Sequence, residues 1–202
     1  GCSSLASVAF PDALQTIGGS AFSGCSSLAT IDFGNALQTI GNSAFGGCLS
    51  LATIDFGDKN VLKTIGHGAF QGCSSLASVV FGNALQTIGN SAFGGCLSLA
   101  TIDFGDKNVL KTIGHSAFQG CSSLASVVFG NALQTIGNSA FSGCRSLVSV
   151  VFGNALETIG EGVFNGCTRL KDVTFPKSME GIIRDVFERS RLNNSEILFI
   201  SR

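Results

Sequence analysis

The apolar positions of this sequence return at a nearly constant interval, and the cysteines mark it. They stand at Cys2, Cys25, Cys48, Cys73, Cys96, Cys121, Cys144 and Cys167, separated by 23, 23, 25, 23, 25, 23 and 23 residues. Around each of them recurs the frame C-x-x-L-x-x-I-x-F-G-x-x-L-x-T-I-G-x-x-A-F-x-G. A fixed period of this length is the signature of a repeat architecture.

Each unit opens with a short segment in which apolar and polar residues alternate. In the second unit Leu28, Ile31 and Phe33 are expected to point inward, which leaves Thr30 and Asp32 outside. This alternation predicts a β-strand. Gly34 follows it, and Pro11 and Pro176 hold the equivalent places after Phe10 and Phe175, so a turn is expected to end the strand.

The second half of each unit is predicted to return the chain to the next cysteine. Leu37 and Ile40 again have the character of inward positions. Asn42 and Ser43 are residues that accept backbone N–H groups at the start of a helix, so a short helical turn is expected over Ala44 and Phe45.

A single unit of this length cannot enclose an interior, because its coil is open above and below. Stacking places equivalent residues in columns roughly 4.8 Å apart, the spacing of parallel strands. We therefore expect a repeat solenoid of mostly β structure with one parallel sheet and a spine of phenylalanines. Two units carry two extra residues, at Asp58-Lys59-Asn60 and Asp106-Lys107-Asn108, which are expected to lengthen a loop only.

The two ends of the chain differ in sequence. Residues 1–166 read as tandem repeats, and residues 167–202 as a diverged last repeat and C-terminal cap in the same continuous solenoid. The cap holds seven of the 12 basic and five of the 13 acidic residues, and a final strand is expected over residues 196–200. At the other end Leu5, Val8 and Phe10 would face water, which predicts a homo-oligomer through this uncapped end or further repeats upstream.

The units resemble the Treponema and BspA type of leucine-rich repeat, L-x-x-I-x-L-P-x-x-L-x-x-I-G-x-x-A-F-x-x-C, to which Leu28–Cys48 corresponds almost position by position. The similarity extends from Cys2 to about Phe187, with Gly in place of the usual Pro in six units. It implies an α/β leucine-rich-repeat solenoid with a right-handed superhelical course, a parallel sheet on the concave side and short helical turns on the convex side. It also implies an extracellular or cell-surface location and the binding of other macromolecules.

Composition narrows the classes of partner. A net charge of −1 gives no electrostatic footprint for nucleic acid, and Gly, Ser, Asn and Thr interrupt every apolar run before it could span a membrane. The eight cysteines share one register of the repeat, so buried thiols are expected rather than disulfides. Their spacing relative to His67 and His115 predicts no metal site, and no cofactor is expected.

The candidate site is the row of residues that point outward from the predicted concave sheet. It comprises Thr30, Asp32, Thr53, Asp55, Ser78, Val80, Thr101, Asp103, Ser126, Val128, Ser149 and Val151. No nucleophile, base and orienting residue can be assembled from the repeat, so no enzyme is predicted. The row favours a non-enzymatic module that binds a protein or glycan, for interaction or adhesion. The alternatives are a hydroxyl array for ice, mineral or glycan, suggested by the column that runs from Thr16 to Thr158, and a structural scaffold without a dedicated ligand.

Overall fold

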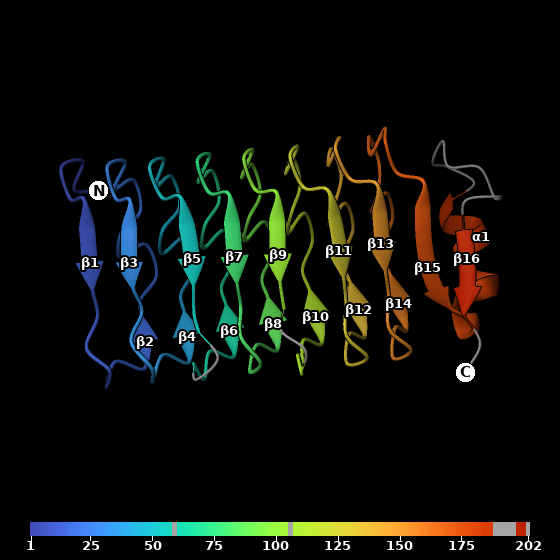
Figure 1. Ribbon diagram of the computed structural model, residues 1–202, viewed down its shortest axis with the longest axis horizontal. Helices are drawn as coiled ribbons and strands as arrows, with labels where there is room; N and C mark the ends of the chain where they lie inside the picture. Colours follow the sequence, from blue (N-terminus) through green and yellow to red (C-terminus); the bar gives the residue numbers. More distant parts are fainter. Residues whose placement is uncertain (58–59, 105–106, 188–196, 201–202) are drawn as a thin grey trace.

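The computed structural model describes all residues except 58–59, 105–106, 188–196 and 201–202, and side chains up to residue 183. The repeats form successive coils in a row along the long axis of the molecule (Figure 1). We number the coils from the cysteine that begins each one: coils 1 to 7 comprise residues 2–24, 25–47, 48–72, 73–95, 96–120, 121–143 and 144–166. The leucine-rich-repeat fold predicted from the sequence is confirmed, whereas its right-handed superhelical course and concave curvature stay predictions.

One side of the solenoid carries the strands that the alternating pattern predicted, and we call it the front sheet. Each of the seven coils contributes three residues, and the C-terminal segment contributes a longer strand. The strands are β1 (Ser7–Ala9), β3 (Thr30–Asp32), β5 (Thr53–Asp55), β7 (Ser78–Val80), β9 (Thr101–Asp103), β11 (Ser126–Val128), β13 (Ser149–Val151) and β15 (Asp172–Pro176).

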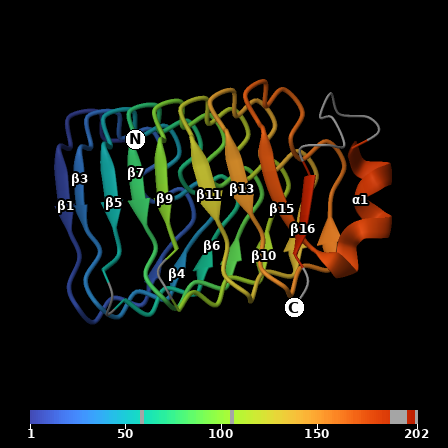
Figure 2. The same ribbon diagram turned by 45° about the vertical axis from the view of Figure 1, so that its right-hand side comes forward.

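A second parallel sheet lies on the opposite side, and the sequence pattern did not predict it. We call it the back sheet. Its strands are the Thr-Ile pairs β2 (Thr16–Ile17), β4 (Thr39–Ile40), β6 (Thr64–Ile65), β8 (Thr87–Ile88), β10 (Thr112–Ile113), β12 (Thr135–Ile136) and β14 (Thr158–Ile159). All seven are hydrogen-bonded in sequence order, Thr opposite Thr. Figure 2, turned by 45° from the view of Figure 1, shows strands of both sheets, with β4, β6 and β10 of the back sheet seen between the coils.

The helical turns expected around Asn42, Ser43, Ala44 and Phe45 are not confirmed: this segment forms consecutive turns, which we call the turn side. Ser43 adopts a left-handed conformation with φ of 54°, which ends a helix. The N–H groups of Ser43, Phe45 and Gly47 donate to His67, Ala69 and Gln71 of the next coil instead of bonding within a helix. The turn side thus bonds each coil to its neighbour in addition to the sheets, and the fold is more purely β than predicted.

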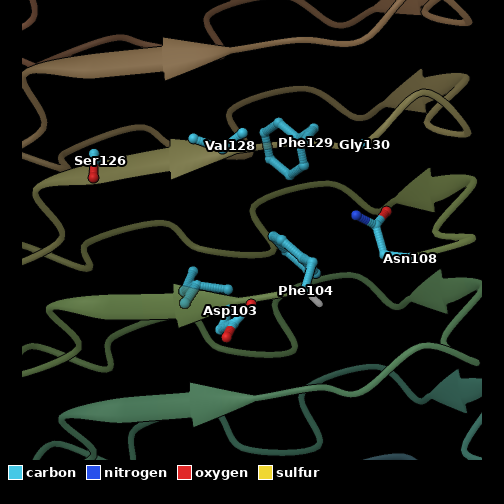
Figure 3. Close-up of a pocket in the computed structure, with 8 residues that line it drawn as sticks. Asp103, Phe104, Asn108, Ser126, Val128, Phe129 and Gly130 are labelled. Atoms are coloured by element: carbon cyan, nitrogen blue, oxygen red, sulfur yellow. The ribbon is translucent and has the colours of Figure 1, made fainter. Parts of the chain in front are cut away.

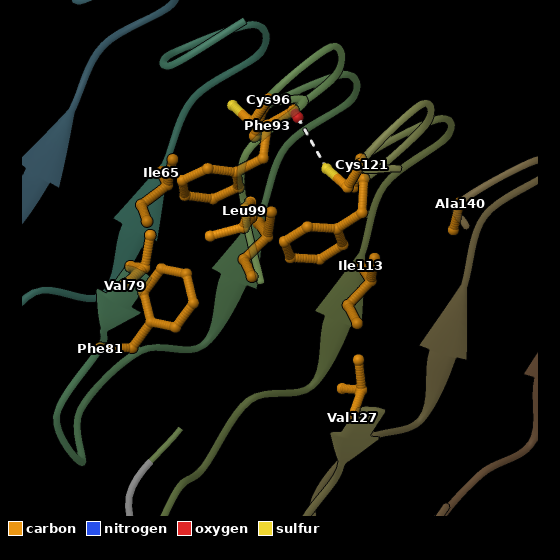
Figure 4. Packing of buried hydrophobic residues seen from close by; sticks show 14 of the residues in the cluster. Ile65, Val79, Phe81, Phe93, Cys96, Leu99, Ile113, Cys121, Val127 and Ala140 are labelled. Carbon is orange, nitrogen blue, oxygen red and sulfur yellow. Dashed lines mark hydrogen bonds between the residues drawn. The ribbon is translucent and has the colours of Figure 1, made fainter. Parts of the chain in front are cut away.

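Two columns of phenylalanine fill the interior. In the column beneath the turn side, neighbouring rings such as Phe70 and Phe93 stack with centroids 5.3 Å apart and 11° between their planes. The front column runs from Phe10 to Phe175, behind the front sheet. Leucine, isoleucine and alanine of successive coils close the space around them (Figure 4). The spine of phenylalanines predicted from the sequence is therefore confirmed, and it consists of two columns.

The C-terminal segment covers the last coil. A short 3-10 turn (Lys177–Met179) leads into helix α1 (Glu180–Phe187), and Met179 and Ile183 are buried against the core. Strand β16 (Ile197–Ile200) pairs in parallel with β15, which confirms the final strand expected over residues 196–200. Glu196 lies outside the described residues. Among the helices that are described, none has the length and apolar character needed to cross a membrane.

Candidate functional site

The structure places the whole predicted row on the outer side of the front sheet. Nine of its members are exposed, and Ser78, Val80 and Ser149 are partly exposed. Their inward neighbours, such as Ile54, Val79 and Val127, belong to the core. Val128 is the most exposed large apolar side chain of the described residues, at 66%.

The row is not continuous, because the front sheet is divided into three blocks. Hydrogen-bonded pairing joins β1 to β3, then β5 to β7 to β9, then β11 to β13, β15 and β16. In the part of the chain that the structure describes, no strand pair links β3 to β5 or β9 to β11. The middle block starts in coil 3 and ends in coil 5, the two coils that carry the two-residue insertions. The insertions themselves lie after β5 and β9 and leave the apolar spacing intact, as expected, because Leu62 and Leu110 are buried and Thr64 and Thr112 keep their register in the back sheet.

The rings beneath the two breaks are tilted. Phe33 and Phe56, under the break between β3 and β5, make an interplanar angle of 41°. Phe104 and Phe129, under the break between β9 and β11, make an angle of 36°. The remaining neighbours of the front column, such as Phe81 and Phe104 at 12°, lie closer to parallel. The core has thus adjusted where the sheet is interrupted.

A hollow of about 370 Å³ opens at the break between β9 and β11 (Figure 3). Asp103 and Ile102 come from β9, Ser126 and Val128 from β11, and Asn108 from the longer loop of coil 5. The rings of Phe104 and Phe129, both nearly buried, form its inner wall. It therefore combines a carboxylate, an amide and a hydroxyl with an apolar surface, the mixture typical of a site that orients a ligand.

Two other carboxylates of the row hold their own turns. The backbone N–H of Gly34 donates to Oδ1 of Asp32 at 3.1 Å, and that of Gly57 donates to Oδ1 of Asp55 at 2.8 Å. In such turns the Asp side chain accepts a hydrogen bond from the backbone N–H of the residue two positions later in the chain. Asp32 and Asp55 end the neighbouring strands β3 and β5, on opposite sides of the first break.

The cysteine column is structural. Seven of the eight are buried free thiols, as predicted, whereas Cys2 on coil 1 is exposed. Each thiol from Cys48 to Cys167 donates to the carbonyl of a phenylalanine that lies 26 or 28 residues earlier in the chain, as Cys121 does to Phe93 at 3.2 Å (Figure 4). Burial raises the pKa of Cys48 from 9.0 to about 11 and that of Cys96 to about 12. Such thiols are poor nucleophiles, because the thiolate is the reactive form.

The two histidines belong to a hydrogen-bonded column that the sequence did not reveal. Nδ1 of His67 accepts the backbone N–H of Asn90 at 3.1 Å, and Nδ1 of His115 accepts that of Asn138 at 3.0 Å. Oδ1 of Asn90 accepts the N–H of His115 in the same way. These side chains were expected to open a helical turn in their own coil, but they bind the next coil instead. Among the described residues, no three potential metal ligands gather.

The end formed by coil 1 keeps apolar side chains that no further coil covers in the structure. Leu5, Val8, Phe10, Leu14 and Phe22 are partly buried against the core. Association through this end stays a prediction.

Comparison with known proteins agrees with this geometry. The family model described as "BspA type Leucine rich repeat region (6 copies)" matches residues 1–110 and 107–200. The crystal structure of the Treponema pallidum leucine-rich repeat protein is 35% identical, with a TM-score of 0.73 over 89% of this chain and 82% of that one. No curated protein matches the sequence.

Two further crystal structures share the fold. A leucine-rich repeat protein from Bacteroides ovatus is 28% identical, with a TM-score of 0.71 over 99% of this chain. The present chain spans 55% of that protein's chain. The pneumococcal vaccine antigen PcpA, at 18% identity and a TM-score of 0.53 over 98% of this chain and 68% of that one, shows a similarity of fold alone. The repeat frame, the stacked coils and the match over both halves together establish that the chain belongs to the BspA-type leucine-rich repeat family.

Proposed function

We propose that the chain is a non-enzymatic binding module at a cell surface, and that its front sheet contacts a protein partner around the break between β9 and β11. The observation that carries the proposal is the exposed Val128 beside the hollow that Asp103, Asn108 and Ser126 line. An apolar side chain at the edge of a polar hollow is the kind of feature on which protein interfaces are centred.

The chemistry of the candidate residues supports binding rather than catalysis. Asp32 and Asp55 accept hydrogen bonds from their own turns, and His67 and His115 accept them from neighbouring coils. Seven of the eight thiols are buried. These carboxylates and imidazoles are thus engaged in holding coils and turns, which agrees with a scaffold that presents a surface.

The location at a cell surface rests on relatives. The Faecalibacterium prausnitzii protein of known structure, 22% identical to this chain, is described as a leucine-rich cell surface protein, and PcpA as a vaccine antigen. We extend that location to this chain as part of the proposal.

An adhesion assay tests the proposal. Beads coated with the chain are applied to epithelial cell layers that are untreated, treated with protease, or treated with periodate to destroy glycans. We expect retention on untreated and periodate-treated cells and its loss after protease. Val128→Arg should lower retention about tenfold, because it places a charge in the apolar centre of the contact.

Gln119→Arg is the matched control. Gln119 is exposed on the turn side, so this substitution adds the same charge away from the front sheet. Both variants must unfold at the wild-type temperature for the comparison to hold. Equal retention of the two variants would overturn the front-face assignment. Retention that survives protease and disappears after periodate would replace the protein partner by a glycan.

A further inference from the structure

The outer face of the back sheet has a second groove, which runs along the solenoid axis. In every Thr-Ile pair the isoleucine is buried and the threonine is at least partly exposed. The next residue is glycine, and beyond it, in coils 2 to 6, stands Asn or His. Over β10, β12 and β14 this arrangement encloses a shallow hollow of about 250 Å³, lined by Thr112 and Thr135, the glycines 114 and 137, and His115 and Asn138.

The glycine floor of the groove is fixed by the stacking of the coils. A Cβ on Gly114 would lie 2.6 Å from the backbone nitrogen of Asn90, and one on Gly137 would lie 2.5 Å from that of His115. These two positions therefore admit no side chain, because a Cβ would meet the backbone of the preceding coil. Because the back sheet is unbroken, its threonine hydroxyls follow one another at roughly the 4.8 Å strand spacing.

The wall opposite the threonines consists of hydrogen-bond donors. Oδ1 of Asn90 and Oδ1 of Asn138 each accept a backbone N–H of the next coil, which leaves the amide nitrogens to donate. Nδ1 of His67 and Nδ1 of His115 accept as well, so the ring proton of each neutral imidazole is on Nε2. The column thus uses its acceptors to hold the coils together and presents donors to a ligand.

Positive charge accompanies the donors on alternate coils. Lys63 and Lys111 precede Thr64 and Thr112 and are exposed, and they belong to coils 3 and 5, the same coils as the two histidines. Coils 2, 4 and 6 have glutamine at this place and coil 7 has Glu157, so the positive charge belongs to the part of the groove over coils 3 to 5. The two lysines are two coils apart, about 10 Å by the strand spacing. A complementary ligand would have acceptor groups along its length and a negative charge at intervals.

We propose that this groove binds a linear acidic polysaccharide that carries a carboxylate or sulfate on every second sugar. The sugar hydroxyls pair with the threonine hydroxyls and the amide donors, and the anionic groups lie toward Lys63 and Lys111. A peptide is less suited, because the strands of an interior ladder have no unpaired edge for its backbone. A single-stranded nucleic acid is also less suited, because the residues that line the hollow include no Phe, Tyr or Trp ring on which a base could stack.

The test uses hyaluronan oligosaccharides, which are linear and carry one carboxylate per disaccharide, with dextran oligosaccharides as the neutral probe. Binding is measured by calorimetry on the full chain at low and moderate salt. We expect hyaluronan to bind and dextran not to bind. Affinity should fall as salt is raised, and an oligosaccharide long enough to span both lysines should bind better than one that reaches a single lysine.

The decisive variant is Lys63→Gln with Lys111→Gln, since glutamine is the residue that the neighbouring coils hold at this place. It should weaken hyaluronan binding about tenfold, in line with the loss of two exposed charge contacts. Thr112→Val with Thr135→Val, which removes hydroxyls and keeps the shape, should also weaken it. Val128→Arg on the front sheet should leave it unchanged.

Three outcomes would overturn the proposal. They are equal binding of dextran, unchanged hyaluronan affinity in the lysine variant, and loss of hyaluronan binding in Val128→Arg. Inhibition of ice recrystallisation by a chain that binds neither oligosaccharide would also overturn it and would assign the threonine column to ice. The lysine variant retains Val128, so its retention in the adhesion assay separates failure of the groove proposal from failure of the front-face proposal.

Discussion

The backbone N–H of Asn90 donates a hydrogen bond to Nδ1 of His67 in the preceding coil, over 3.1 Å. His115 stands in the same relation to Asn138. In both cases a side chain of one coil satisfies the main chain of the next, so these residues stabilise the stacking itself.

Replacing both histidines tests this role. His67→Ala with His115→Ala should lower the free energy of unfolding by about 1 kcal/mol for each site, because it leaves two N–H groups without their acceptors. His67→Asn with His115→Asn should retain most of the stability, since Asn42 and Asn90 accept from the next coil in the same column. Urea unfolding followed by circular dichroism measures both. Equal losses in the two variants would show that the ring, and not the acceptor, matters.

The phenylalanine columns are expected to dominate stability. Phe93 is fully buried and stacks on Phe70 and Phe118 with centroids 5.3 Å away on each side. Phe93→Ala should lower the free energy of unfolding by about 3 to 5 kcal/mol, because its neighbours are held by their own coils and cannot fill the cavity. Phe93→Leu, which retains most of the volume, should lose less. A loss below about 1 kcal/mol for Phe93→Ala in denaturant titration would place Phe93 outside the core.

The glycine after each Thr-Ile pair sets how closely two coils approach. A Cβ on Gly89 would lie 2.7 Å from backbone atoms of Gly66 and His67, so Gly89→Ala should destabilise the fold by about 1 to 3 kcal/mol. Gly18 holds the same place in coil 1, and a Cβ there would meet no atom within 4 Å. Gly18→Ala should therefore be neutral or stabilise slightly, up to about 1 kcal/mol. Thermal unfolding of the two variants measures both effects. Equal destabilisation by Gly89→Ala and Gly18→Ala would show that contact between coils is not the reason for glycine at this place.

The buried thiols make stability depend on alkaline pH. Unfolded thiols ionise above pH 9.0, whereas burial keeps Cys48 and Cys96 protonated up to a pKa of about 11 and about 12. Their contribution is fully present below pH 9.0 and is lost as pH rises from there toward the folded-state pKa values, because unfolding then releases protons. For each such thiol, the equilibrium constant for folding should fall about tenfold per pH unit within this window.

Urea midpoints between pH 8 and 11 check the slope. Cys48→Ala with Cys96→Ala should flatten it, and an unchanged slope would attribute the effect to other groups. In the folded chain at neutral pH a thiol reagent should label the exposed Cys2 rapidly and the buried seven only after denaturation.

Most of the architecture was predictable because each inward position recurs in every coil. The columns of Leu28, Phe33, Leu37 and Ile40 follow directly from the period, and all four side chains are buried. The back sheet was not predicted, since a strand of two residues such as Thr39–Ile40 is too short to show an alternating pattern.

The misplaced features all depend on contacts between coils. Asn42 is a residue that caps helices, yet its Oδ1 accepts the N–H of His67 one coil away. Ser43 at φ of 54° looks like any other polar residue in the sequence, although Gly68 and Gly162 at equivalent places hinted at a left-handed conformation. The breaks of the front sheet flank the coils with insertions. The insertions indicated which coils depart from the repeat. They did not indicate that strand pairing in the front sheet would be lost before coil 3 and after coil 5.

Coils 2 to 5 consist of two consecutive 48-residue segments, 25–72 and 73–120, that differ at four positions. Each segment begins at the cysteine of one coil and ends just before the cysteine of another. Removing or adding one segment therefore leaves every coil stacked on a coil of matching sequence. Recombination between the near-identical gene segments would therefore yield shorter and longer proteins that fold, and the reach of the molecule can change in whole steps while its ends stay the same.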